Sequence, residues 1–347
     1  MISVFFVFFT ILTILYFINI KNKTITDTVL IICGIILILV AGLRDKGLDK
    51  DYFIYRDFWM TTNLKGNVEY SFYLIRNFLK YELRLKFQYL LIVYACLGVT
   101  FKLVAFRKIS PLIWASLLIY FSNYFILHEF TQIRIGVATG FLLLSLYYLS
   151  NKSYIHFYIF AGIAVFFHQS CFFVVIFPLL KNSEKNIKFY YWVIPIGYLF
   201  YFFNTYLNFR IPIPSIQEKI DLYETATESG FMKEEKTNVF NALFLIRILI
   251  LNTVLYYSKK ISEHSPSVYI LVKIYSLSLF SFLFLSKIPV FAFRIQELLG
   301  VVEIILIPCL VFIFSERFRF LGVILVWAIA VVFFLMNIYY VKLLIVK

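Results

Sequence analysis

Apolar runs of about 20 residues recur from residue 2 to residue 346, and no long polar interval separates them. A helix needs about 20 apolar residues to cross roughly 30 Å of hydrocarbon, so such runs are typical of membrane-spanning helices. Apolar residues make up 62% of the 347 residues and charged residues only 15%, against roughly 45–50% and about 25% in soluble domains. These proportions exclude a soluble globular protein and predict one integral membrane domain over residues 1–347.

The lengths of the runs predict an all-α, polytopic transmembrane bundle of about ten full spans. The predicted spans are 2–20, 27–43, 85–106, 110–128, 131–150, 189–207, 239–258, 267–286, 293–314 and 320–341. The stretch 154–180 is ambiguous, because as one helix it would be about 40 Å long. The polar residues of Phe167-His168-Gln169-Ser170 also interrupt it in the middle.

The positions of Lys and Arg favour a helical hairpin for 154–180, since short cytoplasmic loops carry an excess of these residues. With the N-terminus outside and a hairpin at 154–180, the inner loops hold Lys21, Lys23, Arg107, Lys108, Lys152, Lys181, Lys185, Lys188, Lys259, Lys260, Arg317 and Arg319. A single crossing would move the last four of these outside. The hairpin places His168 at its tip, where non-helical backbone needs protein or a water-filled cavity around it.

Two long segments, 44–84 and 208–238, then lie outside the membrane. The first contains an amphipathic stretch over 68–80 that we expect to lie in the interface, and the second is rich in Pro, Glu and Thr, as expected of a mobile flap. The formal net charge is +14, but the basic residues stand singly or in pairs between apolar runs. This pattern indicates contact with membrane lipid and argues against a nucleic-acid partner.

Ionisable side chains from four parts of the chain fall on the outer side in this topology. They are Arg44, Asp49 and Asp51, then Arg134 shortly after His128 and Glu129, then His168, then Arg294 with Glu297. Charges within a membrane are costly and mark partners or function. Each also has a structural interpretation: Arg134 as a snorkelling side chain, Arg294 and Glu297 as an i,i+3 pair, His168 at a helix break, and Arg44 on a solvated flank.

Arginine and histidine together at one membrane face suit the transfer of a glycan from a lipid-linked pyrophosphate. Planar guanidinium groups bind phosphate through paired hydrogen bonds. Imidazole titrates near neutral pH and can take a proton from a sugar hydroxyl. The reaction needs no nucleotide and no cofactor, and aromatic side chains, 21% of the sequence, can stack on sugar rings.

Several short motifs resemble the EpsG family of Wzy-type polysaccharide polymerases. Leu43-Arg44, Gly47-Leu48-Asp49, Tyr52 and Tyr55 resemble the family's LR…G-x-D…Y…Y pattern, and Glu69-Tyr70-Ser71-Phe72 its acidic-aromatic element. The stretch 130–138 is similar to its R-Q-x-I-A helix start, Phe167-His168-Gln169-Ser170 to F-H-x-S, and Arg294-Ile295-Gln296-Glu297 to R-I-x-x-Y. The chain departs from these patterns at Ile135, Leu298 and Asp51.

The resemblance implies a glycosyltransferase with a GT-C-like fold in the bacterial inner membrane, with its active site facing the periplasm. It would move a growing O-antigen, capsule or exopolysaccharide chain from undecaprenyl pyrophosphate onto the next lipid-linked repeat unit. We predict His168, Arg134 and Arg294 as catalytic residues. His168 acts as base or orients the acceptor, and the two arginines bind pyrophosphate. The predicted substrate-binding residues are Arg44, Asp49, Tyr52, Tyr55, Glu69, His128 and Glu297. A chain-length regulator is a candidate partner.

Two other functions remain open on the sequence. Asp49-Lys50-Asp51 could bind a divalent cation in a metal-dependent lipid-linked glycosyltransferase, because hard cations prefer carboxylate oxygens. A flippase or exporter of the same lipid-linked sugar would use a similar surface, although the sequence shows no repeat of the kind found in transporters.

Overall fold

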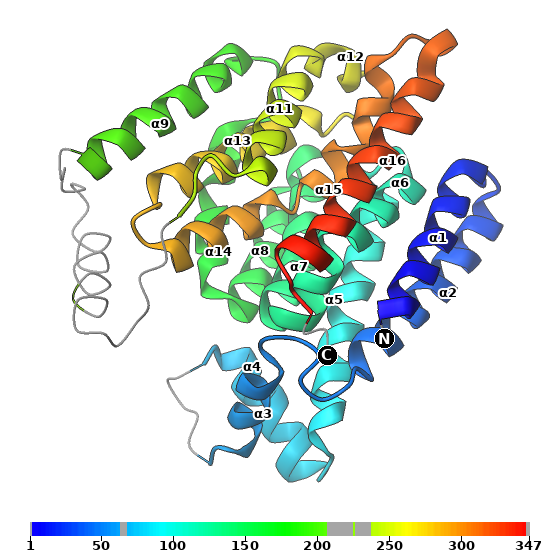
Figure 1. Cartoon of the computed structure of the whole chain (residues 1–347), viewed down its shortest axis with the longest axis vertical. Helices are drawn as coiled ribbons and strands as arrows, with labels where there is room; N and C mark the ends of the chain where they lie inside the picture. Colours follow the sequence, from blue (N-terminus) through cyan, green and yellow to red (C-terminus); the bar gives the residue numbers. More distant parts are fainter. Residues whose placement is uncertain (1, 63–67, 207–224, 226–236, 345–347) are drawn as a thin grey trace. The chain divides into compact units, whose positions relative to one another are not determined.

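The computed structural model describes residues 2–62, 68–206, 225 and 237–344. The elements within these ranges are helical, apart from an isolated β-bridge between Asp49 and Leu344 (Figure 1). Contacts divide the chain into two compact units. The first is Met1–Asn182 with Lys260–Ser267 and Glu303–Lys347, and the second is Ser183–Lys259 with Val268–Val302. The single membrane domain over 1–347 stays a prediction.

The first unit is built around α5, which packs on α2 and α7, while α7 packs on α8. Its α-helices are α1 (Ile2–Ile18), α2 (Lys23–Gly42), α3 (Tyr52–Met60), α4 (Tyr70–Asn77), α5 (Phe87–Ile109), α6 (Ile113–Ile119), α7 (Ile133–Ser150), α8 (Tyr154–Phe167), α15 (Glu303–Leu306) and α16 (Arg319–Leu335). Three 3-10 segments belong to the same unit: η4 (Gln169–Leu180), η6 (Pro308–Ile313) and η7 (Glu316–Phe318).

The first unit also contains four π-helical segments, which have a wider turn than an α-helix. They are η1 (Phe78–Glu82), η2 (Tyr120–Phe125), η3 (Leu127–Thr131) and η8 (Met336–Tyr340). Because π-helical turns are rare and frequent at functional sites, the run from Tyr120 to Thr131 singles out this part of the chain.

The second unit comprises η5 (Ile187–Phe189), α9 (Tyr190–Tyr206), α11 (Ala242–Tyr256), α13 (Val268–Phe284) and α14 (Pro289–Gly300). Helix α13 is its centre and packs on α9, α11 and α14. The short helix α12 (Ser258–Ser262) lies at the boundary between the units.

Within the described residues, four helical stretches are long and apolar enough to cross a membrane: Lys23–Gly42, Phe87–Ile109, Ile133–Ser150 and Glu316–Tyr340. Shorter apolar helices include Ile2–Ile18, Tyr154–Phe167, Gln169–Leu180, Ala242–Tyr256 and Val268–Phe284. The prediction of an all-helical membrane protein is therefore confirmed. The count of about ten spans stays a prediction.

The predicted span 293–314 is not a continuous helix. It is divided into the end of α14, the short α15 and η6. Helix α14 ends at Gly300. Pro308, which lacks an N–H and so cannot continue the hydrogen bonding of α15, begins η6.

The stretch 154–180 forms two arms, α8 and η4, that meet at His168. His168 has extended backbone angles, φ −152° and ψ 116°, and so ends the α-helix. The far ends of both arms return to the same segment: Ser267 bonds to Ser150, just before α8, and the Asn182 side chain donates to the carbonyl of Pro266. This is the geometry of a hairpin with His168 at its tip.

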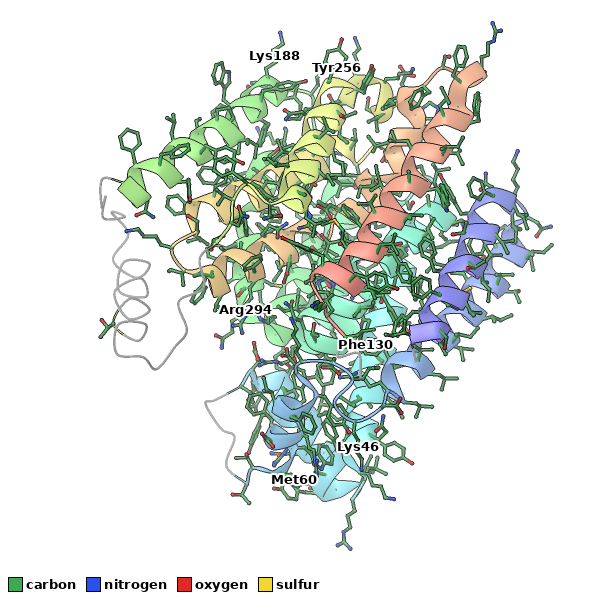
Figure 2. The ribbon with its side chains drawn as sticks, viewed as in Figure 1. Lys46, Met60, Phe130, Lys188, Tyr256 and Arg294 are labelled. Carbon is green, nitrogen blue, oxygen red and sulfur yellow. The ribbon has the colours of Figure 1, made fainter. Side chains whose placement is uncertain are left out.

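The two segments predicted to lie outside differ in what the structure describes. The described residues of this first segment, 44–62 and 68–84, form a group of short elements, α3, α4 and η1, at the N-terminal end of α5 (Figure 1). Figure 2 labels two of its residues, Lys46 and Met60. The predicted flap 208–238 lies outside the described residues, except for 225, 237 and 238.

Candidate functional site

Three segments of the first unit meet at the carboxylate of Glu69. One of its oxygens, Oε2, accepts a hydrogen bond from Nη1 of Arg134, and the other, Oε1, lies 3.7 Å from Nε2 of His168. The side chains are mostly buried: the exposed fractions are 12% for Glu69, 21% for Arg134 and 10% for His168. We call Glu69, Arg134, His168 and Tyr55 the Glu69 cluster. A small part of each of the Glu69, Arg134 and His168 side chains is therefore exposed.

Glu69 is held at the start of α4. Its backbone carbonyl accepts hydrogen bonds from the amides of Phe72 and Tyr73, which fixes the first turn of the helix. Farther along α4, the fully buried guanidinium of Arg76 donates to the carbonyls of Trp59 and Thr61 at the end of α3. These bonds join the two short helices and so position the Glu69 carboxylate.

Arg134 is the second residue of α7, directly after a break at Gln132. The N-terminus of a helix carries a partial positive charge and unpaired amides, and so attracts anions. The guanidinium also lies over the ring of Phe72, 5.8 Å from its centroid. Arg134 and the start of α7 therefore form a positive surface that Glu69 partly neutralises.

The contacts of His168 assign the proton of its neutral ring. The amide of Ser170 donates to Nδ1 at 3.3 Å, so Nδ1 is the acceptor and Nε2 carries the hydrogen. Nε2 is also the atom that faces Glu69. In this tautomer the imidazole presents a hydrogen-bond donor toward the cluster rather than the lone pair that a general base needs.

Tyr55 of α3 is the fourth residue of the cluster and contacts Arg134. Its hydroxyl hydrogen-bonds with Arg134; burial raises the pKa of Tyr55, and the Arg134 charge acts in the opposite direction. Aromatic rings support this arrangement, with Phe72 6.1 Å from Tyr55 and 5.8 Å from Tyr94, and Phe167 6.3 Å from Tyr94. Buried aromatic rings thus pack beside the cluster and exclude water from that side.

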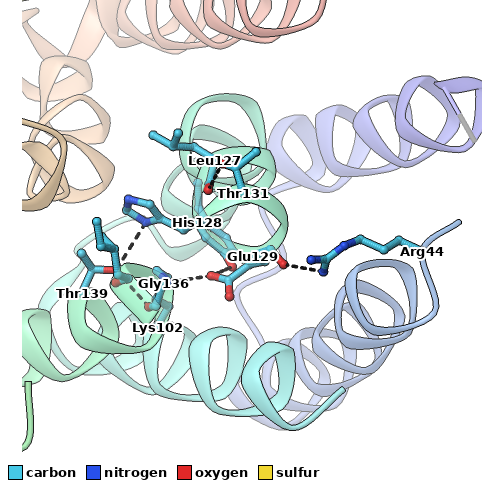
Figure 3. A network of polar contacts seen from close by, with 10 residues as sticks. Arg44, Lys102, Leu127, His128, Glu129, Thr131, Gly136 and Thr139 are labelled. Carbon is cyan, nitrogen blue, oxygen red and sulfur yellow. Dashed lines mark hydrogen bonds and ion pairs between the residues drawn. The ribbon is translucent and has the colours of Figure 1, made fainter. Parts of the chain in front are cut away.

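Arg44 and Asp49 form a fully buried ion pair with 2.8 Å between Nε and Oδ2. Arg44 also donates to the carbonyls of Glu129 at 3.2 Å and Phe130 at 2.9 Å, and so ties the loop after α2 to η3 (Figure 3). Burial raises the pKa of Asp49, while the charge of Arg44 acts in the opposite direction. The pair therefore supports the neighbouring segments from the protein interior, and neither side chain is exposed.

The Asp49 carboxylate does not fit a metal site shared with Asp51. Its Oδ2 faces Arg44, and its Oδ1 accepts from the backbone amide of Asp51 at 3.0 Å. The charge of Arg44 already neutralises it, whereas a divalent cation needs carboxylates that are free to turn toward it. Tyr52, the next predicted residue, is buried, and its ring packs edge-on against Phe87.

His128 lies in a buried polar network inside the first unit (Figure 3). Its Nδ1 is 3.3 Å from the Thr139 hydroxyl, and its ring packs on Tyr124. Next to it, Nζ of Lys102 lies 2.6 Å from Oε1 of Glu129.

The same oxygen of Glu129 also accepts from the Tyr120 hydroxyl at 2.8 Å. Both Lys102 and Glu129 have fully buried side chains. A side chain at Gly98 would collide with the Glu129 carboxylate, so the glycine gives the ion pair its room.

Lys102 and Glu129 were not among the predicted site residues. A signal for Lys102 was present, because it is an isolated charge within the predicted span 85–106. Its partner could not be inferred, since Glu129 is 27 residues away.

Arg294 and Glu297 lie on α14 of the second unit, three residues apart; Figure 2 labels Arg294. Arg294 is exposed and Glu297 is half-buried. Helix α14 is fixed to α13 by the Ser278 hydroxyl, which donates to the carbonyl of Gln296 at 2.7 Å. The role of Arg294 in pyrophosphate binding and the role of Glu297 in holding it stay predictions from the sequence.

The described part of the chain is thus an all-helical membrane protein with a partly accessible Glu-Arg-His cluster in its first unit. The family model described as "EpsG family" matches residues 27–345. The chain therefore belongs to the EpsG family, as its motifs predicted. It is also similar to the amylovoran biosynthesis protein AmsC of Erwinia amylovora, with 24% identity over 300 residues that cover 80% of this chain and 77% of that protein. No solved structure matches the chain, and the GT-C-like fold stays a prediction.

Proposed function

We propose that the protein is a polysaccharide polymerase that transfers a growing glycan from undecaprenyl pyrophosphate onto the next lipid-linked repeat unit. The observation that carries this proposal is the Glu69 cluster, in which a guanidinium, an imidazole and a carboxylate from three distant segments meet with part of each accessible. Membership of the EpsG family and the similarity to an amylovoran biosynthesis protein support the same class of reaction.

In this proposal Arg134 binds the pyrophosphate of the donor. The planar guanidinium of Arg134 and the partial positive charge at the N-terminus of α7 both favour binding of an anion beside Arg134. The guanidinium is paired with Glu69 in the structure. The arriving pyrophosphate takes the place of the carboxylate, and Glu69 becomes free to bind the acceptor hydroxyl.

The transfer breaks the bond between the anomeric carbon and the pyrophosphate oxygen, and the bonding electrons leave with the pyrophosphate. The acceptor hydroxyl oxygen forms the new bond to that carbon, and its proton passes to Glu69. His168 orients the acceptor or the carboxylate through its Nε2 hydrogen. Arg44 and Asp49 support this site by holding the segment before α7. The predicted participation of Arg294 rests on the sequence alone.

The positive-inside rule assigns the cluster to the periplasmic side. Lys23 at the start of α2 and Arg107 and Lys108 at the end of α5 mark the cytoplasmic side, whereas α4 and the N-terminus of α7 belong to the outer one. Assembly at this face suits a donor and an acceptor that are both carried by a membrane lipid.

Substitution of His168 separates a role as hydrogen-bond donor from a role as general base. We expect His168→Gln to keep a clear part of the polymerising activity, because its amide still donates a hydrogen bond, and His168→Ala to lose about 10- to 100-fold, within the range for an acid–base or orienting group. The measurement is the amount of polymer made per membrane-inserted protein. Equal loss in both variants would contradict a role of His168 that is limited to hydrogen-bond donation from Nε2.

Deletion of the gene in its host tests the function itself. We expect the ladder of long surface polysaccharide on a gel to collapse to a single repeat unit, because export of single units does not need the polymerase. A flippase would give a different result, with lipid-linked repeat units accumulating on the inner leaflet. An unchanged ladder, in a host without a second polymerase gene, would overturn the proposal.

A further inference from the structure

A groove of about 890 Å³ lies between α2 and α5 in the first unit, and its character changes along its length. One end is charged and is lined by Lys23, Asp27, Arg107 and Lys108. The remainder is apolar, apart from the hydroxyl of Thr100, and includes Leu30, Ile35, Ile38, Leu103 and Val104. A charged end followed by an apolar channel matches an amphipathic ligand.

The ion pair between the two helices fixes the direction of the groove. Arg107 near the end of α5 contacts Asp27 near the start of α2, with 2.7 Å from Nε to Oδ1 and 3.3 Å from Nη2 to Oδ2. The helices are therefore antiparallel here, and Gly34 of α2 faces Leu103 of α5. The lining residues Asp27 to Ile38 span about 16 Å of helix, close to half of the roughly 30 Å hydrocarbon layer.

The charged end carries a net positive charge. It has three cations and one carboxylate, and because Asp27 offsets Arg107, the charges of Lys23 and Lys108 remain for a ligand. Both lysines are exposed, and Nζ of Lys108 lies 5.1 Å from the centroid of the Tyr147 ring. Basic pockets between membrane helices on the cytoplasmic side suit the phosphate of an anionic lipid.

The groove is separate from the Glu69 cluster. The ring of Tyr94 on α5 supports that cluster through Phe72, and Arg107 lies 13 residues farther along the same helix. This separation is about 20 Å at 1.5 Å per residue. A lipid in the groove thus has its headgroup at the opposite side of the membrane from the proposed reaction.

We propose that this groove binds one anionic phospholipid of the cytoplasmic leaflet. Its phosphate lies at Lys23 and Lys108, and an acyl chain follows the apolar channel between α2 and α5. The lipid holds α2 against α5, which in turn supports the core of the first unit. A zwitterionic headgroup would bring an additional positive charge to an already positive end, so the site prefers a headgroup with net negative charge.

The test measures binding of phosphatidylglycerol and of phosphatidylcholine with the same acyl chains to the purified full chain by native mass spectrometry. We expect selective binding of phosphatidylglycerol. The double variant Lys23→Glu/Lys108→Glu should bind it at least about tenfold more weakly, since each basic residue at a membrane surface contributes about fivefold to binding. The matched control is Lys46→Glu/Lys86→Glu, which makes the same charge change at exposed positions away from the groove.

A second variant addresses the apolar channel without changing charge. Ile35→Trp places a larger side chain at an exposed lining position and should also weaken phosphatidylglycerol binding, in protein that remains monodisperse. Equal binding of the two lipids, or unchanged binding in both groove variants, would overturn the proposal. Displacement of phosphatidylglycerol by undecaprenyl phosphate at equal concentration would also overturn it, because the carrier lipid would then be the occupant.

Discussion

Arg134→Ala is expected to reduce polymer formation by about 10²- to 10³-fold, the effect of removing a group that stabilises charge on a leaving group. The guanidinium stands at the N-terminus of α7 and is the cation of the Glu69 cluster. Arg134→Lys should recover only part of the loss, because lysine keeps the charge but not the planar fork. The measurement is the length and amount of surface polysaccharide in a deletion strain that carries each variant.

Two controls define what the Arg134 result means. Arg56→Ala removes an exposed arginine from the neighbouring helix α3 and should leave the ladder unchanged. Membrane levels of every variant are compared, so that loss of folding is not mistaken for loss of chemistry. A normal ladder from a well-inserted Arg134→Ala protein would remove this residue from the mechanism.

Lys102→Met is expected to destabilise the folded protein by about 3–5 kcal/mol, the usual cost of leaving one member of a buried ion pair without its partner. Lys102 and Glu129 are both fully buried, and in the variant the Glu129 carboxylate would accept from the Tyr120 hydroxyl without the neutralising charge of Lys102. Thermal unfolding of the purified protein in detergent measures the change.

The double variant Lys102→Met/Glu129→Gln should regain most of that stability, because no uncompensated charge is left in the interior. Lys86→Met, at an exposed position just before α5, is the matched control and should unfold like the wild type. If Lys102→Met were as stable as the wild type, the pair would not contribute to the fold.

The all-helical membrane character of the chain was accessible from the sequence, because hydropathy reports directly on transfer into lipid. The break at His168 was also visible, since polar residues interrupt an apolar run there. The type of helical turn could not be predicted from the sequence. Nothing in the composition of residues 120–131 distinguishes a π-helical turn from an α-helical one, and the structure shows that they form the wider turns of η2 and η3.

The candidate site was predictable only in part. Charge in an apolar context singled out Arg134 and His168, and the structure brings both to Glu69. Arg44 and Asp49, which were predicted to bind substrate, form a buried ion pair, and their part in substrate binding stays a prediction. Local sequence does not reveal such a pair, because burial is decided by η3 and the Phe130 carbonyl, 86 residues away from Arg44. For the same reason Lys102 could be recognised as unusual, but its partner could not.

Reconstitution of the purified protein in vesicles with a lipid-linked repeat unit as the sole substrate tests the central claim most directly. If the Glu69 cluster transfers glycan from a pyrophosphate, the wild type will form oligomers of the unit and release one undecaprenyl pyrophosphate per new glycosidic bond, without added nucleotide, and Arg134→Ala will do neither. Vesicles in which the wild type moves the repeat unit across the bilayer without joining units, or in which both proteins polymerise equally, would contradict the account.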